Sequence, residues 1–313
     1  MKKYFYTLLT AATLLTMAAC SQIDLLFGGS GDAEQVSFAI STAQGQSRTA
    51  GDGNTVDQVH YEVWDKITGQ RVVSSITGQN GGSPLVMEAG QAYVRIKLVR
   101  GVPYDITFWA HNHNEQDTAY DITGGLENIT LKPSIMANKE SYDAFCHTLK
   151  DYQIGAGTTK VELKRPFAQV NVGTTLADWQ KALDLQVKIN LSTVTVSGLA
   201  NVFDARKGKA TGNASLTYQL NDVLQETFEV EGDDYQYLGM NYMLADSEKT
   251  LHSLSITLYD GEKEVNTLRV NNMPIKRNWR TNIVGNLLTN KEEFKVVIEP
   301  EFTDDKNGPF DYE

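Results

Sequence analysis

The chain has 313 residues, a formal net charge of -11 and 41% hydrophobic residues, a size and composition that suit two ordinary domains with buried cores. The excess of acidic over basic residues argues against binding nucleic acid, and against binding anionic lipid through the protein surface. Only two cysteines are present, so if Cys20 carries lipid then Cys146 has no partner and a disulfide framework is excluded.

The first 20 residues have the pattern of a bacterial export signal. Lys2 and Lys3 precede an apolar run over 4–17, which is too short to span a bilayer core comfortably. Small residues then precede Cys20, in an arrangement that resembles a lipobox. We therefore expect residues 1–19 to be a signal peptide and Cys20 to be lipidated, for example with palmitate. The alternative is an ordinary cleaved signal with a coincidental cysteine.

A polar tether and a first strand follow this signal. Residues 20–33 end in a glycine-rich stretch, which predicts a flexible linker. Apolar residues then alternate with polar ones over 36–40, the pattern of a half-buried strand. The next segment, 44–54, is polar and glycine-rich and contains Arg48. We expect this segment to be exposed and open to proteolysis.

Strand patterns then follow one another closely up to Pro166, where we place a domain boundary because proline is unfavourable inside a central strand. These strands are expected over 59–64, 71–76, 92–98, 106–110, 129–131 and 160–164.

Beyond Pro166 the chain shows one helix pattern among further strands. The helix is expected over 176–183, capped by Thr175 or Asp178, with Trp179, Ala182 and Leu183 on one face. Asp260 and Gly261 predict a tight hairpin turn. Strands are expected over 167–172, 187–191, 193–196, 215–218, 254–259, 265–270, 279–287 and 294–298.

This density of short strands predicts an all-β protein with two β-sandwich domains in tandem. The predicted segments are a signal peptide (1–19), a lipidated tether (20–33), an N-terminal sandwich (34–165), a C-terminal sandwich (166–303) and an acidic tail (304–313).

No pattern predicts a cofactor, and no catalytic motif stands out, so we do not expect an enzyme. His111 and His113 have a spacing that a zinc site could use, but a polar loop after a strand is the favoured interpretation. Cys146 beside His147 is read as a buried, inert thiol, because adjacent side chains diverge. The four tryptophans are read as core residues rather than as a platform for sugar stacking.

The chain resembles the fimbrillin-like lipoproteins of Bacteroidetes, which include the subunits of type V pili. The resemblance implies two transthyretin-like β-sandwich domains, export as an outer-membrane lipoprotein and display at the cell surface or in a fimbrium. It covers most of the mature chain and is carried by the lipobox at Cys20, Ser47-Arg48-Thr49-Ala50, Tyr104-Asp105-Ile106-Thr107-Phe108-Trp109-Ala110, Asp143-Ala144-Phe145, Lys164-Arg165-Pro166-Phe167-Ala168-Gln169-Val170-Asn171-Val172 and Asn278-Trp279-Arg280-Thr281-Asn282.

The resemblance also implies a route of assembly. An arginine-specific protease would cut between Arg48 and Thr49, and the first strand would leave with the lipid. A strand from another subunit would then fill the vacated groove, since an open sheet edge is a template for strand addition. The expected donor strand carries Phe294, Val296 and Ile298. The alternative is that Arg48 is an ordinary loop residue in an uncut monomer.

Two further expectations come from the resemblance. Asp117-Thr118-Ala119 resembles the O-glycosylation sequence of these bacteria, which makes Thr118 a candidate acceptor. The first functional hypothesis is a fimbrial subunit or fimbrium-associated lipoprotein that acts in adhesion, with like subunits or other fimbrial proteins as partners. The alternative is a monomeric outer-membrane lipoprotein that binds a host or bacterial surface glycan or protein.

Overall fold

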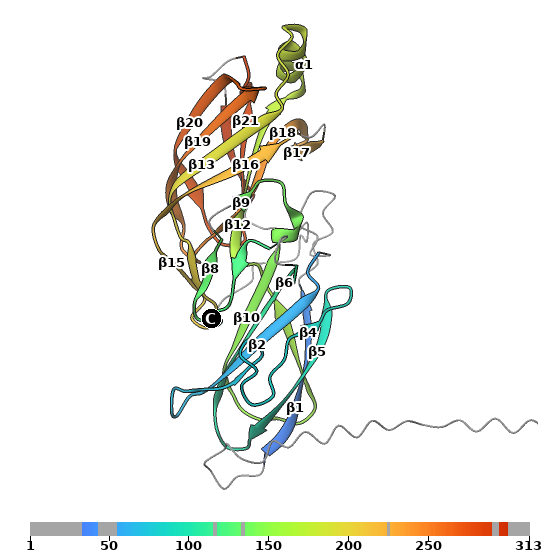
Figure 1. Cartoon of the computed structure of the whole chain (residues 1–313), viewed down its shortest axis with the longest axis vertical. Helices are drawn as coiled ribbons and strands as arrows, with labels where there is room; N and C mark the ends of the chain where they lie inside the picture. Colours follow the sequence, from blue (N-terminus) through green and yellow to red (C-terminus); the bar gives the residue numbers. More distant parts are fainter. Residues whose placement is uncertain are drawn as a thin grey trace, which may run out of the picture. The chain divides into compact units, whose positions relative to one another are not determined.

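The computed structural model describes residues 33–42, 55–114, 118–132, 135–223, 226–289 and 294–299. They all belong to the compact unit Gly31–Glu313, and the other unit, Met1–Ser30, lies outside these ranges. Over the described ranges the chain is mostly β-strand in several sheets, with one α-helix (Figure 1), which confirms the all-β prediction. No helix within the same ranges has the length and apolar character needed to cross a bilayer.

The N-terminal half of the described chain forms two sheets. Its strands are β1 (Ala33–Thr42), β2 (Gln58–Asp65), β3 (Arg71–Ser74), β4 (Leu85–Val86), β5 (Gln91–Val99), β6 (Tyr104–His111), β10 (Ala144–Tyr152) and β11 (Thr158–Leu163). One sheet has the order β11-β1-β5, and the other has the order β10-β6-β2-β3 with β4 also paired to β2.

These two sheets pack face to face, because each presents alternate apolar side chains to the other. In β5 the exposed and buried positions alternate along almost the whole strand, as its sequence predicts. The Phe38 ring lies 5.4 Å from that of Phe108 on the opposite sheet and 5.2 Å from that of Tyr152, centroid to centroid. We call the resulting cluster the N-terminal core; its buried members are Val36, Phe38, Ile40, Val56, Val59, Tyr61, Val63, Val73, Met87, Ala92, Val94, Ile96, Leu98, Tyr104, Ile106, Phe108, Ala110, Phe145, Ile154, Val161 and Leu163.

The C-terminal half forms a second pair of sheets. One contains β17 (Thr227–Val230), β18 (Asp233–Leu244), β12 (Phe167–Thr175), β21 (Arg280–Gly285) and β22 (Phe294–Glu299), in that order. The other contains β20 (Lys263–Ile275), β19 (Thr250–Asp260), β13 (Leu191–Leu199), β16 (Ala214–Asn221) and β9 (Ile135–Met136), in that order. Val170 and Ile283 of the first sheet and Val194 and Ile256 of the second belong to one buried cluster, which we call the C-terminal core.

A smaller sheet joins segments that are distant in the sequence. It contains β15 (Lys209–Thr211), β14 (Val202–Asp204), β8 (Ile129–Leu131) and β7 (Tyr120–Asp121), in that order, and the 3-10 helix η1 (Glu140–Tyr142) follows β9. Trp109 packs edge-on against Tyr120, with ring centroids 5.2 Å apart, and all three residues Trp109, Tyr120 and Phe203 belong to the C-terminal core. Part of the segment predicted for the N-terminal sandwich therefore contributes to this second core.

The helix α1 (Leu176–Asp184) confirms the sequence prediction. Thr175 is its N-cap, and its side chain accepts a hydrogen bond from the backbone N–H of Asp178. Trp179 and Ala182 are buried, as expected. Leu183, predicted on the same face, is 36% exposed.

Most predicted strands are present, and the differences are local. The hairpin at Asp260 and Gly261 joins β19 to β20, and Gly261 has a φ of 61°, the left-handed conformation that favours glycine. Of the strand predicted over 187–191, only Leu191 lies in a strand; the turn after α1 occupies 185–186, and 187–190 have no regular secondary structure. Neither β10 nor β18 was predicted.

Candidate strand-exchange site

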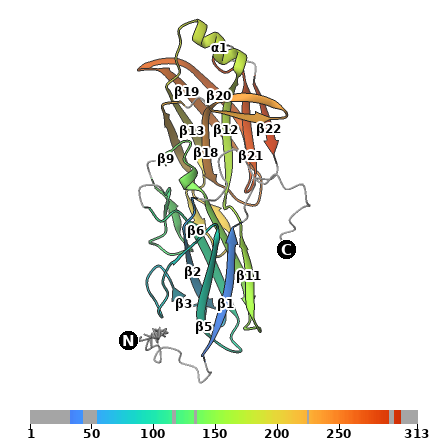
Figure 2. The same cartoon turned by 90° about the vertical axis from the view of Figure 1, so that its right-hand side faces the viewer.

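The strand β1 is the middle strand of its sheet, although it comes first in the described chain. It pairs antiparallel with β5 and parallel with β11, with Phe38 in register with Val94 on one side and Thr159 on the other. Figure 2 shows β5, β1 and β11 side by side. Loss of β1 would therefore expose two strand edges together, which is the geometry that a replacement strand needs.

The inward side chains of β1 are among the most buried in the protein. Val36 is 4% exposed, Phe38 0% and Ile40 2%, while Ser37 and Ala39 face outward and are half-buried. Full burial of such an apolar side chain contributes roughly 1.5–3 kcal/mol. The position of β1 is thus defined by three apolar side chains spaced two residues apart.

The predicted donor strand, β22, has a different environment. It is the edge strand of its sheet and pairs antiparallel with β21, with Val296 in register with Ile283. Val296 is 37% exposed and Ile298 is 39% exposed, whereas Phe294 packs against the C-terminal core. Phe294, Val296 and Ile298 thus repeat the two-residue spacing of β1, with two of the three side chains only partly buried.

Polar contacts hold β22 in its place. The Glu299 carboxylate accepts hydrogen bonds from Arg280 Nη1 at 2.9 Å and from Asn282 Nδ2 at 3.0 Å. Lys295 forms an exposed ion pair with Glu231 at 2.6 Å. These contacts come from β21 and from the end of β17, so the strand is fixed within its own chain by side chains as well as by the backbone ladder.

The other predicted site residues are not brought to this site. Cys20, Arg48 and Thr49 lie outside the described residues. Thr118 is described, and its side chain is buried at 6% exposure, where its Oγ1 accepts from the N–H of Tyr120 at 3.3 Å. Burial does not favour modification of this candidate acceptor, and its glycosylation stays a prediction.

The residues with metal-like or nucleophilic character have ordinary structural roles. His111 Nδ1 accepts a hydrogen bond from Trp109 Nε1 at 2.7 Å, whereas exposed His113 contacts Asp57. Among the described residues no group of three or more histidine, cysteine or acidic side chains is arranged to hold a metal. Cys146 is half-buried rather than fully buried as predicted, and desolvation raises the pKa of its thiol to about 12, which disfavours the reactive thiolate.

The tryptophans largely confirm their interpretation as core residues. Trp64, Trp109 and Trp179 are buried. Trp279 is half-buried, with the Lys276 ammonium 5.2 Å from its ring centroid.

His60 and His111 form a buried pair that should make stability depend on pH. Their ring centroids lie 5.3 Å apart, and burial lowers the pKa of His60 to about 4 and, together with the charges of nearby groups, that of His111 to about 3. Below pH 6.5 these two histidines take up protons in the unfolded chain but stay neutral in the folded chain. We therefore expect the free energy of unfolding to fall as pH decreases from about 6.5 to 4, by about 1.4 kcal/mol per unit for each fully titrating histidine.

Urea unfolding at several pH values measures this slope. The variants His60→Gln and His111→Gln should each show a shallower slope than the wild type. Equal slopes in all three proteins would contradict the assignment.

Two motifs that carry the family resemblance meet at a buried ion pair. Arg165 donates from Nε to Asp143 Oδ1 at 2.9 Å and from Nη2 to Asp143 Oδ2 at 2.7 Å, and both side chains are at most 2% exposed. The guanidinium also lies 4.6 Å from the centroid of the Phe145 ring. Phe145 belongs to the N-terminal core, while Ala144 and Phe167 belong to the C-terminal core. The pair thus lies where the chain passes between the two cores.

Two more of these motifs meet in the parallel pairing of β12 with β21. Gln169 is in register with Arg280, and Asn171 with Asn282. Arg280 Nε donates to Gln169 Oε1 at 2.8 Å, and Asn171 Nδ2 donates to Asn282 Oδ1 at 2.9 Å. These residues are separated by 111 positions, so sequence spacing alone could not have paired them.

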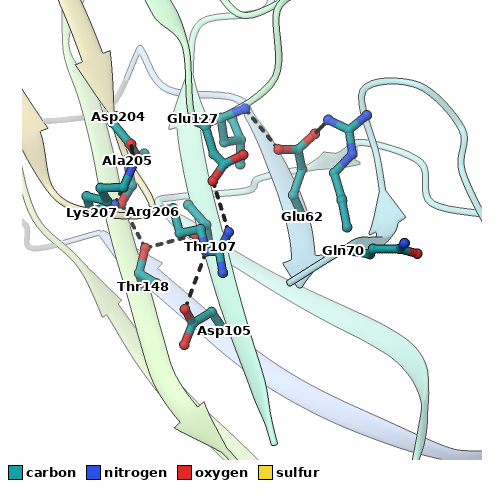
Figure 3. Close-up of polar contacts among 12 residues, drawn as sticks. Glu62, Gln70, Asp105, Thr107, Glu127, Thr148, Asp204, Ala205, Arg206 and Lys207 are labelled. Atoms are coloured by element: carbon teal, nitrogen blue, oxygen red, sulfur yellow. Dashed lines mark hydrogen bonds and ion pairs between the residues drawn. The ribbon is translucent and has the colours of Figure 1, made fainter. Parts of the chain in front are cut away.

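A second polar network fastens the turn after β14 to β6 and β10 (Figure 3). Arg206 bonds to Asp105 at 3.3 Å and to Glu127 at 3.0 Å, and its guanidinium lies 4.8 Å from the centroid of the Trp64 ring. Thr148 Oγ1 donates to the Ala205 carbonyl at 2.8 Å. Burial alone would raise the pKa of Asp105, but Lys150, the Asp151 N–H and Arg206 together lower it. The network stabilises a charged Asp105, which is a structural role.

The fold is similar to that of two Bacteroidetes proteins, one described as polysaccharide-binding and the other as an adhesin. A crystal structure from Bacteroides thetaiotaomicron, described as "putative polysaccharide binding proteins (DUF1812)", is similar with a TM-score of 0.52 at 14% identity, over 85% of this chain and 96% of that one. A "putative adhesin" of the same species has a TM-score of 0.52 at 11% identity, over 87% and 98%. The tip fimbrial protein Mfa3 from Porphyromonas gingivalis has a TM-score of 0.46 at 11% identity, over 85% and 99%.

A family model described as "Family of unknown function (DUF6562)" matches residues 30–312, and the chain belongs to this family. A comparison with curated proteins found no match. The predicted resemblance to Bacteroidetes fimbrial proteins is thus confirmed as a similarity of fold.

Proposed function

We propose that this chain is a cell-surface fimbrial subunit or fimbrium-associated lipoprotein that assembles by strand exchange and acts in adhesion. One observation carries the proposal. The first strand of the described chain is the central strand of a three-stranded sheet, and its buried apolar residues match the spacing of the edge strand β22. The proposed role is structural and adhesive rather than catalytic.

The proposed assembly has an order that follows from these positions. Residues 1–19 are removed, Cys20 is lipidated, and the lipid holds the chain at the outer membrane until a protease cuts between Arg48 and Thr49. Segment 20–48, which includes β1, then leaves. Strand β22 of another copy fills the groove, and its Val296 and Ile298, now 37% and 39% exposed, gain apolar burial there.

We further infer that the architecture consists of two tandem transthyretin-like β-sandwich domains, over 34–165 and 166–303. The two buried cores, each between a pair of sheets, support two sandwiches, although several residues between Trp64 and Ala144 contribute to the second core rather than to the first. The similar fold of the Bacteroides thetaiotaomicron proteins, which extends over 85% and 87% of this chain, is consistent with it.

The variant Arg48→Ala tests the proposal, with Arg48→Lys as the matched control for arginine specificity. In the native host, wild-type assembled material should begin at Thr49 by mass spectrometry and should give an SDS-resistant ladder of multimers. Both variants should keep the lipidated N-terminus at Cys20 and give no ladder. Assembled wild-type material that still begins at Cys20 would contradict the processing step.

A monomeric lipoprotein that binds a surface glycan is the second candidate. It is favoured by the similarity of fold to a structure described as polysaccharide-binding. A monomer at the cell surface that gives no ladder but binds on a glycan array would support this candidate over strand exchange.

A further inference from the structure

The outer face of the sheet β11-β1-β5 is solvent-exposed and differs in charge from the whole chain. Along β5 the outward residues Tyr93, Arg95 and Lys97 are all exposed, in alternation with buried ones. Lys160 on β11 is exposed as well. Glu162 is the one acidic side chain at the outward positions of these three strands, so cations outnumber acids here although the chain has a net charge of -11.

Strand register places these side chains around a strip of small residues. Ala39 of β1 is in register with Tyr93 on one side and with Lys160 on the other. Ser37 is in register with Arg95. Long cationic and aromatic side chains therefore flank short ones, and none of the three cations has an ion pair with a described residue.

The exposed tyrosine indicates which class of ligand these cations would bind. Tyr93 is 67% exposed, and an aromatic ring left in water beside these cations offers a stacking surface with a hydrogen-bonding hydroxyl. Outward residues of a strand recur about every 6.7 Å, so Tyr93, Arg95 and Lys97 form a row about 13 Å long. A row of this length fits several units of a linear polymer better than it fits a single small anion.

We propose that this face, through Tyr93, Arg95 and Lys97 of β5 and Lys160 of β11, binds an acidic polysaccharide; these four side chains remain in the protein when β1 leaves. The cations bind its carboxylate or sulfate groups, and Tyr93 stacks on a sugar ring. The local cationic charge complements a polymer with widely spaced anions, whereas the net charge of -11 repels a polyanion as dense as nucleic acid. The site rests on the proposed surface location only for its biological setting, and its chemistry is independent of strand exchange.

Calorimetric titration of the full chain tests the site, with polygalacturonate as the carboxylated probe, the less densely charged chondroitin sulfate as the sulfated probe and dextran as the neutral one. The triple variant Arg95→Gln/Lys97→Gln/Lys160→Gln should lose at least roughly tenfold in affinity for an acidic probe. Tyr93→Ala should lose about fivefold, while Tyr93→Phe should stay within about twofold of the wild type. The wild type should not bind dextran, and whichever acidic probe binds more tightly identifies the anion.

A matched control has the same charge change on exposed residues away from this face: Lys249→Gln/Lys263→Gln/Arg269→Gln. It should bind the acidic probes as the wild type does. An equal loss in this control, unchanged binding by the triple variant, or equally tight binding of single-stranded DNA would overturn the proposal. None of these results depends on a multimer ladder. Failure of the polysaccharide proposal would therefore not contradict strand exchange, and failure of strand exchange would not contradict the polysaccharide proposal.

Discussion

Replacement of Asp143 by alanine is expected to lower the free energy of unfolding by about 3–5 kcal/mol, the usual cost of leaving one partner of a buried ion pair unpaired. Arg165 would lose two hydrogen bonds, of 2.9 and 2.7 Å, at a position where its side chain is only 2% exposed. Water cannot easily replace the carboxylate there. The site also lies between the two cores, so both should be affected.

Urea unfolding followed by circular dichroism measures this loss, and two controls isolate its cause. The double variant Asp143→Leu/Arg165→Met removes both charges and should be more stable than the single variant. The variant Lys207→Ala removes a 70% exposed partner of Asp204 and should cost much less than Asp143→Ala, because water screens an exposed pair. If Asp143→Ala costs no more than Lys207→Ala, the buried pair does not have the role assigned to it.

Replacement of Phe38 by alanine is expected to cost about 3–5 kcal/mol, because it would leave a cavity between the two N-terminal sheets. The Phe38 ring is fully buried against Phe108 and Tyr152. The same change should weaken the hold of β1 on its sheet, and in the proposed assembly this is the strand that must leave.

Unfolding in urea again supplies the measurement, and Ser37→Ala is the matched control one residue away on the outward face. Ser37→Ala should change the free energy of unfolding by no more than about 0.5 kcal/mol. Hydrogen exchange in the paired strands β5 and β11 should increase in Phe38→Ala and stay unchanged in Ser37→Ala. Equal stability of the two variants would show that β1 is not held by its apolar side chains.

The elements predicted well share one property: their environment differs between two faces. In β1 and β5 buried and exposed residues alternate, so the sequence itself carries a period of two. Thr175 caps α1 through a local hydrogen bond, which depends only on residues three positions apart. Such patterns depend on neighbours in the chain and can be read without a structure.

The two longest elements that were missed lack this contrast. The last ten residues of β18 are all buried, on both faces, so no alternation marks it as a strand. Half-exposed residues of β10 likewise follow no period of two. For the candidate site, the apolar spacings of β1 and β22 could be predicted, but the central position of one strand and the edge position of the other could not.

The sequence by itself therefore determined the class of fold, the positions of most strands, the helix with its cap and the resemblance to fimbrial proteins. Only the tertiary structure decided which strands pair: β1 with β11, β12 with β21, and Asp143 with Arg165. The physical reason is that periodicity records which face of an element is buried, whereas pairing between distant segments follows from the closure of a whole core. The groove proposed for strand exchange could therefore not be predicted from periodicity, because β5 and β11, the strands that border it, are far apart in the chain.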